Sequence, residues 1–140
     1  MIPRIDHALT LVIPARNEAQ RLPPTLAAAQ AFFDAWGIDY RVIVVDNNSA
    51  DGTGCLAAPF GTRFTTVLEP RAGKGAAVRR GMLHATGAVV AFTDADLPFG
   101  LEALRSGYDW IRTGRCDVVF GARDLAGAPR VTRPWHRSMA

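Results

Sequence analysis

The stretch that decides the fold is Gly87–Pro98, GAVVAFTDADLP. Its apolar run ends in two carboxylates, Asp94 and Asp96, with one alanine between them. Side chains alternate along an extended backbone, so both carboxylates can point the same way and reach one cation. The pattern therefore indicates a strand that ends in a metal site. In the alternative interpretation Asp94 merely finishes the strand and Asp96 caps a helix that Pro98 opens, since both residue types are favoured there.

Outward from this stretch, apolar runs alternate with helical patterns along the whole chain. Strands are predicted at 8–14, 40–46, 62–68, 88–93 and 117–121, and helices at 18–36, near Asp51, at 74–85 with Gly87 as its stop, and at 101–113. Strands that alternate with helices imply a largely parallel sheet covered on both faces. We therefore predict an α/β fold in three layers, with the sheet between helices.

Length and composition are those of an ordinary globular domain. With 140 residues, 49% of them hydrophobic and 21% charged, the chain can bury one core, and we expect a single domain over residues 1–140. No apolar run reaches the roughly 18 residues of a membrane span, and the first residues lack the features of a signal peptide. A cytoplasmic location is therefore expected, and His7, near the N-terminus, is expected at the surface.

The net charge of +3 arises at the C-terminal end, where residues 111–140 hold six arginines against two acids. Clustered arginines suit phosphate or an anionic membrane surface, and a solvated face is the alternative. Arg79 and Arg80 have no interleaved aromatic residues, so nucleic acid is not an expected partner.

Polar residues follow each of the first four predicted strands. In parallel α/β sheets, ligands bind at the carboxyl ends of the strands, so these residues are expected to form one site. They are Pro14, Arg16 and Glu18 after the first strand, Asp46 and Asn47 after the second, the loop 71–76 with Lys74 after the third, and Asp94 with Asp96 after the fourth.

The loop at 71–76, RAGKGA, has the composition of a phosphate-binding turn. Glycines let the backbone approach an anion, the following helix offers unpaired N–H groups, and Lys74 adds a positive charge. It is not a Walker A loop, because Leu68 stands where glycine is needed and Gly75 where Ser or Thr binds magnesium. Nor does it fit the dinucleotide fingerprint, which needs a small residue at Val78. A flexible glycine turn with a solvated lysine is the alternative.

Five motifs in order carry a family resemblance: LVIPARNE, VIVVDNNSADGT, GKGAAVRRGMLHATG, VVAFTDADL and DVVFGAR. Together they resemble the family 2 glycosyltransferases of GT-A fold. The similarity is greatest to the branch that makes polyprenyl-phosphate sugars, such as the dolichyl-phosphate glucosyltransferases and mannose synthases. It covers residues 8–123.

The resemblance implies a nucleotide-sugar donor site at the first two strands. Pro14, Arg16 and Glu18 match the motif beside the base and ribose, with Arg16 where many members have Tyr. Asp46 matches the acid that contacts the nucleoside. Asn47 replaces a second Asp that is common in the family, so UDP-glucose and GDP-mannose both remain candidate donors, with a slight lean to the former.

The resemblance also implies the groups around the diphosphate. Lys74 matches the loop near the diphosphate, Asp94 and Asp96 match the pair that holds Mg²⁺ or Mn²⁺, and Arg123 matches an arginine that faces the sugar diphosphate. A cation held there would neutralise the charge that develops on the leaving oxygen, and transfer would invert the anomeric configuration.

A polyprenyl-phosphate acceptor follows from the same resemblance. Its phosphate oxygen is ionised at neutral pH and needs positioning more than a general base. Arg130, Arg133 and Arg137 are candidates for that positioning and for peripheral contact with the cytoplasmic face of a membrane.

Length is the main departure from the family, whose members usually continue well beyond this point. We therefore expect a C-terminally short GT-A domain with an incomplete acceptor site, and its unpaired sheet edge favours a homodimer. A non-catalytic nucleotide-sugar-binding module is the alternative function. A sugar nucleotidyltransferase is a third reading, weakened because the first strand lacks a glycine-rich loop for a nucleoside triphosphate.

Overall fold

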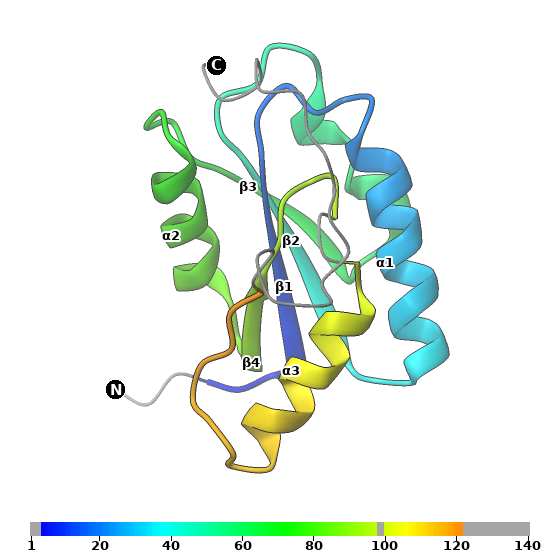
Figure 1. Ribbon diagram of the computed structural model, residues 1–140. Coiled ribbons are helices and arrows are strands. Elements are labelled where there is room, and N and C mark those ends of the chain that lie inside the picture. Colours follow the sequence, from blue (N-terminus) through cyan, green and yellow to red (C-terminus); the bar gives the residue numbers. More distant parts are fainter. Residues whose placement is uncertain (1–3, 98–99, 122–140) are drawn as a thin grey trace.

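Strands and helices alternate along the computed structural model, which describes residues 4–97 and 100–121 (Figure 1). The elements are β1 (His7–Ala15), α1 (Leu22–Trp36), β2 (Tyr40–Asp46), the 3₁₀ turns η1 (Thr53–Cys55) and η2 (Ala58–Phe60), β3 (Phe64–Leu68), α2 (Lys74–His84), β4 (Gly87–Phe92) and α3 (Glu102–Arg112). The four strands form one sheet in the order β3-β2-β1-β4, and every neighbouring pair is parallel.

The register brings the carboxyl ends of the strands to one edge of the sheet. Ala15 of β1 lies opposite Asp46 of β2, which in turn lies opposite Leu68 of β3. In β4, Phe92 lies opposite Val12, so the residues that follow β4 run beside the end of β1. The loops after β1 and β2 and the start of α2 therefore lie together, at the top of Figure 1.

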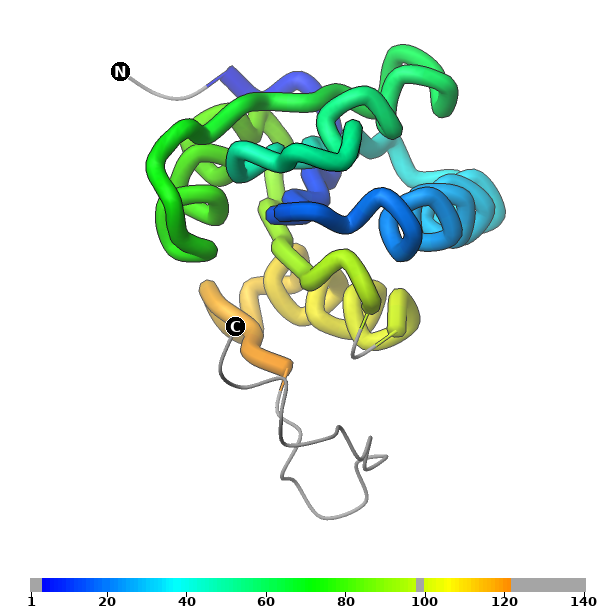
Figure 2. The backbone as a smooth tube through the Cα atoms, turned by 90° about the horizontal axis from the view of Figure 1, so that it is seen from above, coloured from blue at the N-terminus to red at the C-terminus, as the bar shows by residue number. Residues whose placement is uncertain are grey.

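Helices cover both faces of the sheet. Leu11 and Ile13 of β1 belong to a core with α1, against which the partly buried Leu104 of α3 also packs. Val12 points to the opposite face and packs with Ala77 of α2. Figure 2 shows the same division, with α2 on one side and α1 and α3 on the other. The predicted three-layer α/β arrangement with a parallel sheet is confirmed.

Two predicted boundaries were wrong for reasons of backbone chemistry. The first helix begins at Leu22 and not at Glu18, with prolines in its first turn. A longer helix would place those prolines in its interior, where they clash with preceding carbonyls. Gly87 does not stop α2, because the helix ends at His84 and the next residue, Ala85, is already extended. Gly87 lies inside the pairing of β1 with β4.

The predicted strand at 117–121 is not formed. Val118 is 61% and Phe120 84% exposed, and Val119 lies against Gly107 of α3, where an added Cβ would be 3.4 Å from its Cγ1. The short apolar run predicted a strand, but this segment packs on a helix instead of pairing with β4. Within the described part of the chain, no helix has the length and apolar character needed to cross a membrane.

His7 is buried, contrary to the expectation that it lies at the surface. Only 8% of it is exposed, and its Nε2 lies 2.7 Å from Thr10 Oγ1, which also accepts a hydrogen bond from Gly87 N. Burial is the main cause that lowers the pKa of His7 below 6.5. The folded state therefore favours the neutral ring.

This burial predicts a contribution to acid sensitivity. The unfolded chain binds a proton at His7 more readily than the folded chain does. Above pH 6.5 the ring is neutral in both states and does not change the unfolding free energy. As pH falls from 6.5 through the lowered pKa, protonation of the unfolded chain lowers the unfolding free energy. In His7→Gln, we expect the loss of unfolding free energy between pH 7 and pH 5 to be smaller than in the wild type, measured by urea titration. His84→Gln, at an exposed position, is the control and should leave the loss unchanged. Equal pH dependence in wild type and His7→Gln would contradict the prediction.

Candidate functional site

The two carboxylates after β4 lie in a turn and not on an extended strand. The strand ends at Phe92, and Leu97 N donates to Asp94 O at 3.1 Å. The geometric argument from an extended backbone was therefore wrong, although both acids do lie at the carboxyl edge of the sheet. Capping of the next helix by Asp96 was also wrong, because α3 begins only at Glu102.

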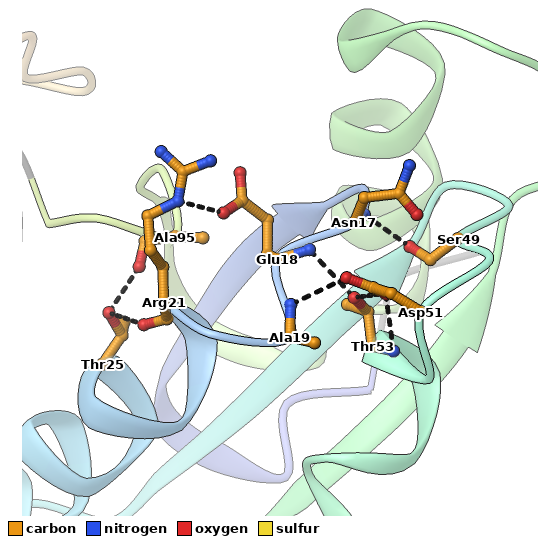
Figure 3. Close-up of polar contacts among 9 residues, drawn as sticks. All are labelled: Asn17, Glu18, Ala19, Arg21, Thr25, Ser49, Asp51, Thr53 and Ala95. Carbon is orange, nitrogen blue, oxygen red and sulfur yellow. Dashed lines mark hydrogen bonds and ion pairs between the residues drawn. The ribbon is translucent and has the colours of Figure 1, made fainter.

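The turn is anchored through the residue between the acids. Ala95 is 4% exposed, and its carbonyl oxygen accepts a hydrogen bond from the hydroxyl of Thr25 in α1 (Figure 3). Asp94, by contrast, keeps 32% of its side chain exposed. The backbone of the turn is thus fixed to the core while a neighbouring carboxylate remains accessible.

Lys74, the first residue of α2, reaches this turn. Its Nζ lies 2.5 Å from Asp94 Oδ1, although the two residues come from different strand-end loops. Gly73 precedes the helix with φ of 125°, a conformation open to glycine, and no side chain caps this helix. Backbone N–H groups of the first turn are therefore left for an anion beside a positive charge.

The carboxylate oxygens of Asp94 and Asp96 suit a hard divalent cation as ligands. Carboxylate oxygens suit Mg²⁺ and Mn²⁺, and the ammonium of Lys74 is a positive group already held at Asp94. Among the described residues there is no cluster of three or more His, Cys, Asp or Glu that could hold a metal. A cation would therefore need further ligands from a bound diphosphate and water, which is the usual way that Mg²⁺ is held beside phosphates.

Hydrogen bonds in both directions join the loop after β1 to the loop after β2. Figure 3 shows those donated by the loop after β1. We call residues 17–19 together with 49–53 the loop clasp. Its bonds join Asn17 N to Ser49 Oγ at 2.9 Å, Ala50 N to Asn17 Oδ1 at 2.9 Å, Glu18 N to Thr53 Oγ1 at 2.9 Å and Ala19 N to Asp51 Oδ2 at 3.0 Å. The clasp fixes the backbone that follows Arg16 and Asp46.

Asp51 organises the second half of the clasp. Its Oδ1 accepts from Thr53 N at 3.1 Å and from Thr53 Oγ1 at 2.5 Å, and Thr53 is fully buried. The bond from the Thr53 hydroxyl, followed by the bond from Ala19 N, lowers the pKa of Asp51. The local pattern predicted a turn and a short helix near Asp51 but not these bonds, because the partner residues lie more than thirty positions away.

Asp51→Ala is expected to loosen the loop after β1 without unfolding the sheet. Ala19 N and the Thr53 hydroxyl lose their acceptor, so amide protons at 17–19 should exchange with solvent at least tenfold faster, measured by hydrogen exchange with mass spectrometry. Asp39→Ala removes an exposed acid before β2, at the other end of the sheet, and should leave that exchange unchanged. Unchanged exchange in Asp51→Ala would show that the clasp does not depend on this carboxylate.

Hydrogen bonds and a close backbone contact also fix the residues after β2 and β3. Asp46 Oδ1 accepts from Ser49 N at 3.0 Å, and Gly54 passes so close that an added Cβ would lie 2.7 Å from Asp46 Oδ2. The buried Glu69 accepts from Arg71 N at 2.9 Å and faces Arg71 Nε at 3.3 Å. These bonds lower the pKa of Glu69, the backbone bond most. Arg71 belongs to the loop at 71–76 that was predicted as part of the site, whereas Glu69 was not predicted.

The other predicted residues differ in their surroundings. Pro14 is half-buried at the end of β1 and Arg16 is exposed. Glu18 forms an ion pair with Arg21, with 2.7 Å between Oε2 and Nε. Asn47 is buried, and its side chain faces the loop before α2. Arg123, Arg130, Arg133 and Arg137 lie outside the described residues, and their roles stay predictions.

Comparison with the sequences of known proteins points to one family. The family model "Glycosyl transferase family 2" matches residues 10–139. An uncharacterised glycosyltransferase of Mycobacterium tuberculosis is 43% identical over 121 residues, which cover 81% of this chain and 51% of that protein. A dolichyl-phosphate beta-glucosyltransferase of Drosophila melanogaster is 40% identical over 99 residues, 63% of this chain and 30% of that protein. The chain spans about half the length, or less, of the curated relatives it matches.

Solved structures agree with the sequence comparison. Mannosyl-3-phosphoglycerate synthase from Rubrobacter xylanophilus aligns with a TM-score of 0.58 and 26% identity, over 64% of this chain and 31% of that one. Glucosyl-3-phosphoglycerate synthase from Mycobacterium tuberculosis, in complex with UDP, aligns with a TM-score of 0.56 and 26% identity, over 72% of this chain and 41% of that one. The fold is therefore that of GT-A glycosyltransferases, and the chain belongs to glycosyl transferase family 2.

Proposed function

We propose that residues 1–140 form a donor-binding domain for a nucleotide sugar of the UDP-glucose or GDP-mannose type. The observation that carries the proposal is the pair formed by Lys74 Nζ and Asp94 Oδ1 at 2.5 Å. It places the uncapped start of α2, which suits phosphate, beside the acids that suit a divalent cation. A sugar diphosphate needs both kinds of group at one place.

A structurally similar protein supports this choice of nucleotide-sugar donor. Glucosyl-3-phosphoglycerate synthase from Mycobacterium tuberculosis, 25% identical with a TM-score of 0.55 over 70% of this chain and 39% of that one, has been solved in complex with Mn²⁺ and UDP-glucose. Pro14, Arg16, Glu18, Asp46 and Asn47 are our candidates for the nucleoside side of the site, as the sequence resemblance implied. Arg16 is the exposed member of this set.

The proposed reaction moves the sugar to a polyprenyl phosphate. This acceptor is supported by the names of two relatives, the Drosophila dolichyl-phosphate enzyme and an undecaprenyl-phosphate 4-deoxy-4-formamido-L-arabinose transferase from Enterobacter that is 31% identical over 132 residues. Arg130, Arg133 and Arg137 remain candidates for the acceptor phosphate and for contact with the cytoplasmic face of a membrane. Pairing of two copies at the outer edge of β4 is a further part of the proposal.

The chemistry asks for charge stabilisation more than for a base. As the anomeric bond breaks, the electron pair stays on the leaving diphosphate oxygen, and the acceptor phosphate oxygen attacks the opposite face, which inverts the configuration. Lys74 and the first amides of α2 bind the developing charge, and Arg123 is our candidate for the same role. Asp94 and Asp96 would hold Mg²⁺ or Mn²⁺, which supplies Lewis-acid stabilisation of the leaving group.

Calorimetric titration with UDP and GDP, with and without Mn²⁺, tests the donor site. We expect one of the two nucleotides to bind and its binding to require the metal. A folded protein that binds neither nucleotide would overturn the proposal.

An assay with the matching nucleotide sugar and undecaprenyl phosphate then tests transfer, with mass spectrometric detection of the lipid product. Formation of the glycosylated lipid would support the proposed transferase activity. Metal-dependent binding without product would instead favour a non-catalytic nucleotide-sugar-binding module, the alternative function.

A further inference from the structure

Asn47 makes three hydrogen bonds to one loop. The residue is 3% exposed, at the end of β2, and its Nδ2 donates to Glu69 O at 2.9 Å and to Arg71 O at 2.7 Å. Its Oδ1 accepts from Gly73 N at 3.0 Å. One buried amide therefore fixes three backbone positions along the segment that leads from β3 to α2.

This segment decides where α2 begins. Gly73, the last residue held by Asn47, is the residue before the first turn of the helix, and no side chain caps that turn. Lys74 follows directly and reaches Asp94. The position of the first turn of α2 relative to the Asp94 turn thus depends on a side chain that stands apart from both.

We propose that Asn47 is a positioning residue, which aligns the start of α2 and Lys74 with Asp94 so that both meet the diphosphate of the donor. The inference rests on the proposed function and deepens it. It differs from the role implied by the resemblance, in which position 47 lies among the nucleoside contacts, because the Asn47 amide is turned into the protein and bonded there on both its nitrogen and its oxygen.

In this chain, the backbone that faces position 47 requires donors, which an amide supplies and a carboxylate does not. A carboxylate only accepts hydrogen bonds, so at position 47 it would face the carbonyl oxygens of Glu69 and Arg71 without a proton between them. A protonated carboxyl group regains one donor. Burial beside carbonyl oxygens raises the pKa of such a group, so the defect should diminish at low pH.

The test compares UDP binding by wild type and Asn47→Asp in the presence of Mn²⁺, by calorimetry at pH 8 and pH 5.5. We expect affinity at least about tenfold weaker than wild type at pH 8 and within about threefold at pH 5.5. Asp46 is the neighbour in sequence, Glu69 and Arg71 accept the Asn47 bonds through their backbones, and Arg71 and Arg80 act on the Glu69 carboxylate. These charged residues are common to both proteins, so the ratio of affinities at each pH isolates the substitution.

Asn48→Asp is the matched control, because it adds the same charge one residue away at an exposed position. It should bind UDP within about twofold of wild type at both pH values. A weakening equal to that of Asn47→Asp would assign the effect to charge alone and overturn the inference. So would an undiminished deficit of Asn47→Asp at pH 5.5, or none at pH 8.

A second variant tests the inference if Asn47→Asp does not stay folded. If Asn47→Asp melts below the assay temperature, Asn47→Ser removes the amide nitrogen and oxygen, and with them all three hydrogen bonds, without adding charge. It is expected to weaken UDP binding at least about threefold. Wild-type affinity in that variant would overturn the inference. Failure of the proposed function looks different, because the wild type itself would then bind no nucleotide.

Discussion

Replacing both Asp94 and Asp96 with asparagine is expected to abolish Mn²⁺-dependent nucleotide binding and to lower sugar transfer at least about a thousandfold. The asparagines keep the size of the side chains but remove the charge that a divalent cation needs. Because the Lys74–Asp94 pair is half exposed, its loss should change the unfolding free energy by less than about 1 kcal/mol. Binding is measured by calorimetry and stability by urea titration.

Asp109→Asn is the matched control, since it removes an exposed carboxylate from α3. It should leave nucleotide binding and transfer at wild-type values. If the Asp94→Asn/Asp96→Asn protein is folded and still binds nucleotide with the same dependence on Mn²⁺, the acids are not the metal ligands, and the assignment of this turn must be abandoned.

Gly87→Ala is expected to destabilise the protein by about 3 kcal/mol or more, a large share of the roughly 5–15 kcal/mol that holds a typical domain folded. Gly87 lies in β4 beside the central strand β1, and an added Cβ would be 2.5 Å from Thr10 N and 2.8 Å from Leu9 C. These are backbone atoms of a buried strand, so no side-chain rotation relieves the overlap. Urea titration at neutral pH measures the effect.

Gly75→Ala provides the matched control for this substitution. The site lies in the first turn of α2, and an added Cβ there meets no atom within 4 Å. Alanine should therefore be neutral or stabilise by up to about 1 kcal/mol through helix propensity. Equal unfolding free energies for the two variants would mean that β1 and β4 can separate at little cost, contrary to the close packing at Gly87.

The strands could be predicted from the sequence because β1 and β2 are buried on both faces. A strand covered on both faces contains a continuous apolar run, which is visible without knowledge of its partners. The candidate site was predicted from the rule that ligands bind at the carboxyl ends of parallel strands. That rule correctly grouped Lys74 with Asp94, which are far apart in the chain.

Contacts between distant residues could not be predicted in the same way. Asn47, Asp51 and Thr25 were each typical of loops or helices locally, and their roles depend on partners brought close by the fold. The strand prediction at 117–121 was wrong for the same reason, since a short apolar run does not reveal whether it will pack against a sheet edge or a helix.

The loop clasp has a consequence for exchanging parts between family members. Each of its two loops supplies both donors and acceptors to the other, so neither keeps its shape when its counterpart is foreign. Chimeric enzymes that transplant residues 16–21 alone should therefore lose the grafted conformation. Those that transplant residues 16–21 and 48–53 as one cassette should retain it, which makes this pair of loops the smallest exchangeable unit at this edge of the sheet.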